Sequence, residues 1–404
     1  MRIAVLTSTN RRAGGLETYL ENVIPELSGR GHAVSLWHEV SEPDTRPLVP
    51  LPDSVESFQC ARPAVTALRR WAPDILLSNG LSEPDTEAEL HSVAPVVFVA
   101  HNYHGTCISG TKCWARRARR PCHRTFGWQC LLHYYPHRCG GLNPLTMARL
   151  YRQAGVRLAT VRACRRVVTL SAHMRDEYLA HGLLNEQVVV VPYGPPLSAR
   201  RVTAPPRTSG AYRLVCMGRL ESLKGFDLLI DALPAVRGAV GSPVELLVIG
   251  DGPEAAALKA RAAETQRADG QLTVTFAGWQ SPDKRDESLA GADLFVMPSV
   301  WPEPFGLAGL EAAHMGVPSV AFDVGGVADW LVDGETGRLA SGDMPTSESL
   351  ARAIVDCLRS PNRRAMGERA STLAAGRSPQ RHATALVEVL ALAAGRSHPT
   401  ARAH

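Results

Sequence analysis

The stretch "LFVMPSVWPEPFGLAGLEAAHMGVPSVAFDV", residues 294–324, contains the pattern that decides the fold. The apolar runs at 294–299 and 318–324 predict two buried strands. Between them, Gly306 precedes an apolar segment that predicts a helix. A strand, a helix and a second buried strand in this order are typical of parallel strands joined by a crossover helix.

The same alternation recurs along the chain. It predicts further strands at 3–8, 32–40, 74–80, 96–102, 165–171, 188–194, 212–219, 244–252 and 272–279. Helical periodicity is seen at 16–31, 172–182 and 380–394. We therefore predict an α/β protein with two Rossmann-like, doubly wound parallel-sheet domains that face each other across a cleft.

A segment rich in Pro, Ser, Thr and Arg separates the two halves and predicts a linker at 196–210. The domains are then expected at 1–195, with a Cys-rich insert at 104–141, and at 211–377; a helix and a disordered tail follow at 378–404.

Composition narrows the classes of protein. The 404 residues are 45% hydrophobic and 21% charged, as in an ordinary globular protein. The net charge of +5 is too mild to indicate nucleic acid. No apolar stretch approaches the ~20 residues that span a bilayer, and "MRIAVLTSTN" lacks the features of a signal peptide. We expect a cytoplasmic protein.

Ligands of such sheets bind beyond the carboxyl ends of the strands. Four predicted strand ends lead into unusual loops: "GRLESLKG" (218–225), "IGDGP" (249–253), "EPFGLAGLE" (303–311) and "DVGGVADWL" (323–331). Taken singly, Arg219 and Lys224 could be solvated, and Gly250 could serve a tight turn. Taken together, the loops favour a site for a nucleoside diphosphate.

The residues of these loops suit the parts of such a ligand. A helix that begins near Gly306 offers free N–H groups to an anion, and Arg219 and Lys224 would neutralise a diphosphate. Glu311 lies roughly 8 Å along that helix, at ~1.5 Å per residue, where it could accept both ribose hydroxyls. Glu303 precedes the helix, nearer the reacting carbon. The alternative for Glu311, a helix surface position, is disfavoured by its apolar neighbours.

The chain resembles the family-four retaining glycosyltransferases, which have the GT-B fold. The resemblance rests on "GGLETYL" (14–20), "GRLESLKG", "IGDGP", "FAGW" (276–279), residues 297–326 and "DGETGRL" (333–339), and it covers most of residues 1–380. Two glutamates separated by seven residues are a mark of this family. One departure is "GGVAD" (325–329), where the family commonly has Gly-Gly-hydrophobic-Pro-Glu, so Asp329 is not assigned to the site.

The resemblance implies a role for each matching residue. Arg219 and Lys224 would contact the diphosphate, Glu303 the donor sugar and Glu311 the ribose. Phe305, Gly306 and Leu307 would supply backbone amides, and His101 would lie beside the donor sugar. Gly14 and Gly15 would close on the diphosphate from the N-terminal, acceptor-binding domain, while residues 211–377 bind the nucleotide sugar.

The expected chemistry needs no metal. The chain has no Asp-x-Asp pair, so the cationic side chains and the helix end would stabilise the leaving group. The family implies retention, and we favour a front-side displacement in which the leaving phosphate helps to deprotonate the acceptor. UDP is taken as the nucleotide; the acceptor is a sugar, a lipid-linked glycan or a small molecule.

Five of the nine cysteines lie in residues 107–139. A structural zinc would explain an insert without a core of its own, whereas reduced, packed cysteines are the alternative. Some family members have cysteines at positions like Cys107, Cys122, Cys130 and Cys139, which would then be the ligands. The basic run from Trp114 to Arg124 would bind an anionic acceptor, contact the inner face of a membrane or be solvated.

Three functions are compared. A glycosyltransferase is favoured. A sugar-nucleotide epimerase or hydrolase of the same architecture is second, and the glutamate pair and "GRLESLKG" speak against it. A non-catalytic module that binds a partner or nucleic acid through the Cys-rich insert is third. Turnover of a sugar nucleotide with and without acceptor separates them.

Overall fold

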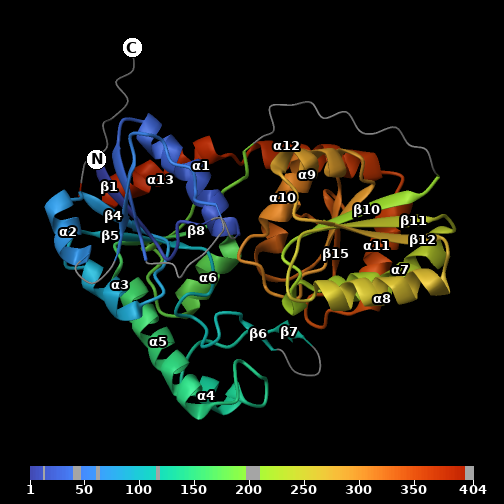
Figure 1. Ribbon diagram of the computed structural model, residues 1–404, viewed down its shortest axis with the longest axis horizontal. Coiled ribbons are helices and arrows are strands. Elements are labelled where there is room, and N and C mark those ends of the chain that lie inside the picture. The colour runs from blue at the N-terminus through green and yellow to red at the C-terminus, as the bar shows by residue number, and fades with distance from the viewer. Residues whose placement is uncertain (12–13, 40–46, 61–63, 115–118, 197–209, 396–404) are drawn as a thin grey trace. The chain divides into compact units, whose positions relative to one another are not determined.

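The computed structural model describes the chain except for residues 12–13, 40–46, 61–63, 115–118, 197–209 and 396–404. The described residues form two compact units (Figure 1). The first unit comprises residues 1–111, 124–196 and 377–404, and the second comprises 112–123 and 197–376. Each unit contains one parallel sheet, which confirms the predicted α/β class. The predicted linker and tail lie almost wholly outside the described residues.

The first unit has a sheet of seven described strands in the order β3-β2-β1-β4-β5-β8-β9. The strands are β1 Arg2–Thr7, β2 Ala33–His38, β3 Glu56–Gln59, β4 Ile75–Ser78, β5 Val96–Ala100, β8 Arg166–Thr169 and β9 Val188–Val190. The helices are α1 Gly15–Gly29, α2 Ala64–Trp71, α3 Pro84–Leu90, α4 Gln129–Tyr134, α5 Pro144–Ala163, α6 Ala172–Ala180 and α13 Pro379–Ala393.

Helix α13 belongs to the first unit although it ends the described chain. It packs beside α1, and Figure 1 shows it, in red, among the blue and green elements of that unit. The Tyr19 hydroxyl lies 2.9 Å from His382 Nε2, and the Arg30 guanidinium donates to the Gln380 carbonyl at 2.9 Å. The last helix therefore completes the core of the unit that contains the N-terminus.

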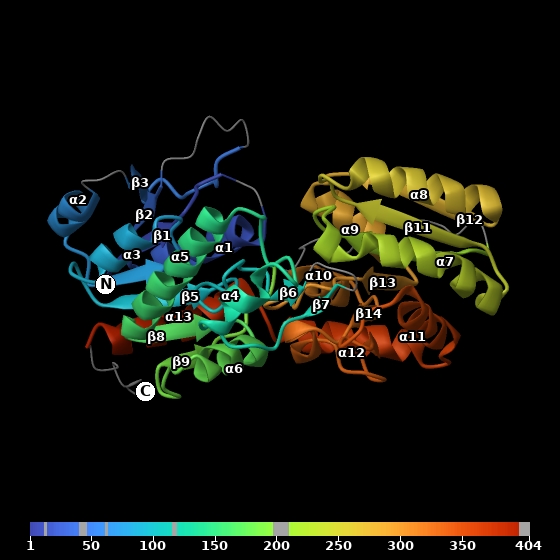
Figure 2. The ribbon, with the colours of Figure 1, turned by 90° about the horizontal axis from the view of Figure 1, so that it is seen from below.

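The second unit has a six-stranded sheet in the order β12-β11-β10-β13-β14-β15. Its strands are β10 Tyr212–Met217, β11 Val244–Ile249, β12 Leu272–Gly278, β13 Leu294–Met297, β14 Ser319–Phe322 and β15 Gly337–Ala340. Its helices are η1 Ser222–Lys224, α7 Phe226–Val240, α8 Ala255–Ala268, α9 Pro282–Ala290, α10 Leu307–His314, η2 Gly325–Asp329, α11 Ser347–Arg359 and α12 Arg363–Ala375. Helices lie on both sides of the sheet (Figure 2).

The burial of the strands explains their composition. Strands β4, β5, β13 and β14 are buried at every residue, because helices cover both faces of the sheets. A strand covered on both faces loses the alternation of polar and apolar residues and becomes a continuous apolar run. The predicted strands at 96–102 and 294–299 match β5 and β13 for this reason.

A short hairpin of the Cys-rich segment belongs to the second unit. Strands β6 Cys113–Trp114 and β7 Arg120–Pro121 pair antiparallel, and residues 112–123 group with the second unit. The remainder of the segment, with α4, belongs to the first unit. We predicted from the sequence that the whole insert, residues 104–141, belongs to the N-terminal domain. In the structure, this segment is divided between the two units.

Candidate active site

The order of strands in the second sheet locates a binding crevice. Strands β11 and β12 lie on one side of β10, whereas β13, β14 and β15 lie on the other. In sheets of this kind, ligands bind where the strand order reverses, beyond the carboxyl ends of the two central strands. The loops that follow β10 and β13 contain Lys224 and Glu303, respectively. The structure thus brings two predicted site residues to the switch point.

Lys224 and Glu303 form an ion pair at this point. Lys224 Nζ lies 2.6 Å from Glu303 Oε1, and the Glu303 side chain is 8% exposed. Lys224 Nζ also lies 4.6 Å from the centroid of the Trp301 ring. The Trp301 indole N–H is buried and has no acceptor among the described residues. A buried donor without an acceptor is costly in water-excluded surroundings, so this N–H is suited to a ligand oxygen.

Backbone contacts fix the loop that contains Glu303. The Gly326 N–H donates to the Glu303 carbonyl at 2.7 Å, so the fourth predicted loop packs against the third. The Trp330 indole N–H donates to the Phe305 carbonyl at 2.7 Å, and both side chains are buried. The Glu303 carboxylate therefore projects from a rigid segment, as a pre-organised site requires.

Helix α10 begins at this site. Its N-cap, Gly306, has φ 89° and ψ 54°, in the left-handed region where glycine is least strained. A Cβ there would lie 3.1 Å from Trp330 Nε1 and 3.2 Å from Met297 Cε, so the position is also crowded. No side chain among the described residues caps the helix. The Gly309 N–H donates to the Gly306 carbonyl at 3.0 Å. The N–H groups that precede it at the start of the helix can therefore bind an anion.

Arg219 and Gly250 follow the neighbouring strands β10 and β11. The Arg219 side chain is 67% exposed, and its Nε lies 2.8 Å from Glu221 Oε1, so it is not part of the Lys224–Glu303 contact. Gly250 has φ 132°, and a Cβ on it would lie 1.9 Å from the Gly218 carbonyl oxygen. A side chain at position 250 would therefore clash with the loop that follows β10, which explains why this residue is a glycine.

Glu311 has a partner that the sequence did not predict. Its Oε2 lies 3.1 Å from Nη1 of Arg285 on α9, and its side chain is 16% exposed. Burial raises the pKa of the Glu311 carboxyl, whereas Arg285 lowers it. The predicted contact between Glu311 and a ribose stays a prediction. Such a contact would have to share the carboxylate with Arg285.

In the first unit, the strand order reverses between β1 and β4. The loop after β1 leads to Gly14, the N-cap of α1, and to Gly15, the first residue of that helix. Both glycines are exposed, and no side chain among the described residues caps the helix. Residues 12–13 of this loop lie outside the described residues. The roles of Gly14 and Gly15 stay predictions.

His101 directly follows β5 and is held by Asn79, which follows β4. His101 Nε2 lies 2.8 Å from Asn79 Oδ1, while Asn79 Nδ2 donates to the Leu6 carbonyl at 3.1 Å. Because Asn79 donates through Nδ2, its Oδ1 must accept from the histidine, which assigns the ring proton to Nε2. Burial, with a smaller effect of His382, lowers the pKa of His101 to about 3. His101 is therefore a neutral imidazole with its lone pair on Nδ1 at physiological pH.

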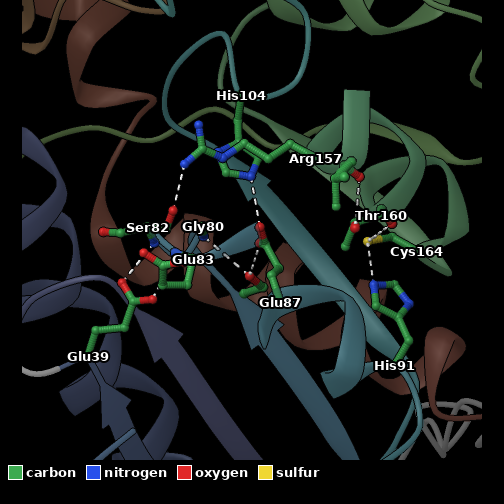
Figure 3. Close-up of polar contacts among 12 residues, drawn as sticks. Glu39, Gly80, Ser82, Glu83, Glu87, His91, His104, Arg157, Thr160 and Cys164 are labelled. Atoms are coloured by element: carbon green, nitrogen blue, oxygen red, sulfur yellow. Dashed lines mark hydrogen bonds and ion pairs between the residues drawn. The ribbon is translucent and has the colours of Figure 1, made fainter. Parts of the chain in front are cut away.

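A buried polar network stabilises the segment after β4 (Figure 3). The Glu87 side chain accepts from Ser78 Oγ at 3.0 Å and lies 2.8 Å from His104 Nε2. The Gly80 N–H donates to Ser78 Oγ at 3.2 Å. Glu87 is 3% exposed. Glu87 and Asn79 were not predicted from the sequence, although polar "SNG" (78–80) at the end of a buried strand was a signal for Asn79.

The predicted zinc ligands lie in the Cys-rich segment. No three His, Cys, Asp or Glu side chains of the described residues are grouped as a metal site requires. Cys107, Cys122, Cys130 and Cys139 are all partly buried. Whether these cysteines bind a metal stays a prediction.

Two arginines of the basic run contact other groups of the chain. Residues 115–118 of the run lie outside the described residues. Arg119 Nη2 donates to Asp227 Oδ2 at 2.5 Å and Arg119 Nη1 donates to the Ser222 carbonyl. Arg120 lies over the Trp114 ring at 4.3 Å. Arg119 thus links the hairpin to both ends of the turn that contains Lys224.

Two family models match the chain. Residues 13–198 match the model described as Glycosyltransferase Family 4, and residues 211–360 match the model described as Glycosyl transferases group 1. A D-inositol 3-phosphate glycosyltransferase of Nocardia farcinica is 26% identical over 93% of this chain and 84% of its own length. A GDP-mannose-dependent alpha-(1-6)-phosphatidylinositol monomannoside mannosyltransferase of Mycolicibacterium smegmatis is 33% identical over 38% of this chain and 40% of its own length.

Solved structures have the same fold. Anabaena Alr3699/HepE, crystallised with UDP and glucose, has a TM-score of 0.66 and 19% identity over 97% of this chain and 100% of its own. Sucrose-phosphate synthase of Thermosynechococcus elongatus has a TM-score of 0.72 and 18% identity over 96% and 98% of the two chains. These likenesses confirm the predicted GT-B type of fold, with two parallel-sheet α/β domains. No described helix is long and apolar enough to cross a bilayer.

Proposed function

Because the chain belongs to the group 1 and family 4 glycosyltransferases, we propose that it moves a sugar from a nucleoside diphosphate sugar to an acceptor hydroxyl with retention of configuration. The observation that carries this proposal is the Lys224–Glu303 pair at the switch point of the second sheet. An ammonium and a carboxylate there match the two ends of a sugar diphosphate, which has anionic phosphates at one end and hydroxyl donors at the other.

The residues of the second unit have separate tasks in this proposal. The N–H groups at the start of α10, with Lys224 and Arg219, bind the diphosphate. The Glu303 carboxylate accepts hydrogen bonds from sugar hydroxyls, and Glu311 accepts from the ribose. The Trp301 indole N–H supplies one more donor to a ligand oxygen. Gly14, Gly15 and His101 of the first unit are further contacts proposed from the family pattern.

The proposed reaction is a front-side displacement. The bond between the anomeric carbon and the diphosphate oxygen breaks, and the acceptor oxygen bonds to the same face of that carbon. The acceptor proton passes to an oxygen of the departing diphosphate. The cationic groups and the α10 amides stabilise the negative charge that develops on the leaving group, so transfer needs no metal.

UDP is the proposed nucleotide, and a structure with the same fold supports it. The HepE structure contains UDP, whereas the mannosyltransferase relative is named for GDP-mannose. The proposed acceptor is a sugar, a lipid-linked or phosphate-bearing molecule, or another small alcohol, and the proposed place of action is the cytoplasm or the inner face of a membrane.

Ligand-induced stabilisation tests this proposal. A ligand that binds the native state alone stabilises it by RT ln(1 + [L]/Kd), which is about 2.7 kcal/mol at a hundredfold excess over Kd. In a thermal-shift panel of UDP, GDP, ADP and TDP with their monophosphates, we expect UDP to raise the melting temperature most. UMP should act less, because it offers fewer anion contacts. No shift with any diphosphate at millimolar concentration would contradict the proposal.

Turnover separates the proposed reaction from its alternative. An epimerase or hydrolase consumes the sugar nucleotide without an acceptor, whereas a transferase consumes it quickly when an acceptor is present. We expect acceptor-dependent release of the nucleoside diphosphate, unchanged by EDTA.

Elemental analysis of the same preparation tests whether Cys107, Cys122, Cys130 and Cys139 bind a metal. Close to one zinc per chain would establish a structural metal, and the absence of zinc would leave the cysteines packed and reduced.

A further inference from the structure

Helix α4 presents an apolar face to solvent. Trp128, Leu132 and Tyr135 are 65%, 62% and 36% exposed. Trp128 and Tyr135 cap the helix with αR dihedral angles, so the helical path runs from 128 to 135. The spacings i, i+4 and i+7 place the three side chains on one face. Tyr134, which is fully buried, anchors the other side.

Two more exposed leucines follow in the adjoining segment, Leu142 in the loop before helix α5 and Leu145 in its first turn. Leu142 and Leu145 are 73% and 78% exposed. The loop between the two helices packs against the inner side of α4, since a Cβ on Gly140 would lie 2.3 Å from the Tyr134 hydroxyl. Figure 1 shows α4 next to the lower end of α5, and the helices are in contact. We call Trp128, Leu132, Tyr135, Leu142 and Leu145 the α4–α5 apolar surface.

These exposed side chains are concentrated in one segment. Of the ten large hydrophobic residues that are exposed in the described structure, five lie within the eighteen residues 128–145. Exposed hydrophobic residues scattered singly need no explanation, but a cluster of them marks a surface that contacts something apolar. Exposed tryptophan and tyrosine beside leucine is the composition of a surface that lies at a membrane interface.

The charge of the surrounding segment identifies the partner. Residues 90–175 contain no Asp or Glu and fourteen Lys and Arg, so this segment carries +14. The remainder of the chain has 44 − 14 = 30 basic and 39 acidic residues, hence −9. Arg124, Arg138 and Arg149 are exposed in the same helical region as the apolar surface. Arg152 of this segment pairs with Asp85, and Arg175 pairs with Asp176. The three exposed arginines near the apolar surface repel a second copy of it and attract an anionic surface.

We propose that the α4–α5 apolar surface inserts into the interface of a bilayer that contains anionic lipids, with Arg124, Arg138 and Arg149 at the level of the phosphates. Burial of the five side chains in the acyl boundary and attraction of the arginines to anionic head groups act together, because the binding of interfacial helices increases with buried apolar area and with attraction to anionic lipids. Arg124 is the last residue of the basic run predicted from the sequence, whereas Arg138 and Arg149 lie outside that run, and Arg119 of the run pairs with Asp227. The membrane contact does not depend on the proposed transfer reaction.

Vesicle sedimentation of the full chain tests the proposal. Vesicles of phosphatidylcholine with 30% phosphatidylglycerol are compared with phosphatidylcholine alone. We expect binding to the anionic vesicles that weakens as salt is raised, because Arg–phosphate attraction is screened. Trp128→Ser with Leu132→Ser and Leu145→Ser should lower the partition coefficient about tenfold or more. Arg124→Gln with Arg138→Gln and Arg149→Gln should do so to a similar degree, on anionic vesicles alone.

Matched controls exist in the same chain. Leu184→Ser and Trp279→Ser change residues of the same types that are 57% and 76% exposed elsewhere. Arg364→Gln changes an arginine that is 93% exposed. These controls should bind vesicles like the wild type, and all variants should keep the wild-type melting temperature because the altered side chains are exposed.

The outcomes are separable from those of the proposed function, because vesicle binding requires no donor or turnover. Wild-type protein that stays in the supernatant with anionic vesicles overturns the proposal. So does a surface variant that binds as well as the controls. A dimer in lipid-free buffer that the serine variants dissociate, without vesicle binding by the wild type, would assign the surface to a second copy instead.

Discussion

Removal of the Lys224 charge should have a large and specific effect on stability. Lys224→Met keeps the alkyl stem over Trp301 but leaves the Glu303 carboxylate, 8% exposed, without its 2.6 Å partner. Loss of one partner from a nearly buried pair costs ~2–3 kcal/mol, less than for a fully buried pair since Lys224 is 24% exposed. At ~2–4 °C per kcal/mol, the melting temperature should fall by ~5–10 °C.

A double-mutant cycle identifies the cause. Glu303→Gln alone should cost about 1 kcal/mol, because the amide oxygen still accepts from Lys224 Nζ and the lysine can reach water. In the Lys224→Met background, Glu303→Gln removes a carboxylate that has lost its partner. It should therefore raise the free energy of unfolding by about 1–2 kcal/mol. Thermal or urea unfolding of the four proteins measures the coupling. Transfer should be at least ~100-fold lower than in the wild type in all three variants, because each lacks the charged contact, including the double variant whose stability is partly restored.

A lysine elsewhere in the second unit provides the control. Lys259 Nζ lies 5.9 Å from the Phe276 ring centroid, and Lys259→Met removes the same charge over an aromatic ring without leaving a buried carboxylate. It should change stability by less than ~0.5 kcal/mol. If Lys224→Met were no less stable than Lys259→Met, or if Glu303→Gln gave no recovery in the Lys224→Met background, the pair would not have the role assigned to it.

Three other predictions concern pH and the hairpin. Burial raises the pKa of the Glu311 carboxyl. The ionised carboxylate therefore lowers the stability of the folded protein as pH rises above ~4.3, the pKa of the unfolded chain. Melting curves should show that Glu311→Gln is more stable than the wild type at pH 7 but not at pH 3. Asn79→Asp places a negative charge beside His101 and raises its pKa from about 3, so kcat should acquire a new pH-dependent limb that the Asn79→Ser variant lacks. Arg119→Glu should raise KM for the donor about tenfold, and adding Asp227→Arg should restore it; no rescue by the reversed pair would refute the link.

Strands that are buried on both faces were the easiest elements to predict. The runs at 294–299 and 96–102 have no polar alternation, and they match β13 and β5 to within a few residues. Strands β3 Glu56–Gln59 and β15 Gly337–Ala340 were missed. Each has only four residues, and β3 is mostly exposed, so neither forms an apolar run. Edge strands of this kind are identified by their pairing partners, which a local pattern does not contain.

The same limit applies to the site. The position of Lys224 and Glu303 at strand ends followed from the alternation of elements, because the carboxyl ends of parallel strands share one edge. The residues that contact the site residues could not be predicted in this way. Arg285 of α9 and Asn79 after β4 are 26 and 22 residues from the groups they contact, and those separations are bridged by tertiary packing. The division of the Cys-rich segment between two units had no local signal either.

The pairing of Lys224 also changes how the charge of a diphosphate would be balanced. The Lys224–Glu303 pair is neutral as a unit, so it contributes position more than net positive charge. The attraction must then come from the amides at the start of α10 and from Arg219. The Arg219 side chain is exposed and pairs with Glu221 near the surface, so it can turn toward a ligand at little cost. Arg219→Ala should therefore weaken binding of UDP, measured by calorimetry, more than Lys224→Met does. Lys224→Met should reduce kcat more than it reduces affinity for UDP. Equal effects of both changes on affinity would show that the ion pair opens to give the ligand a full positive charge.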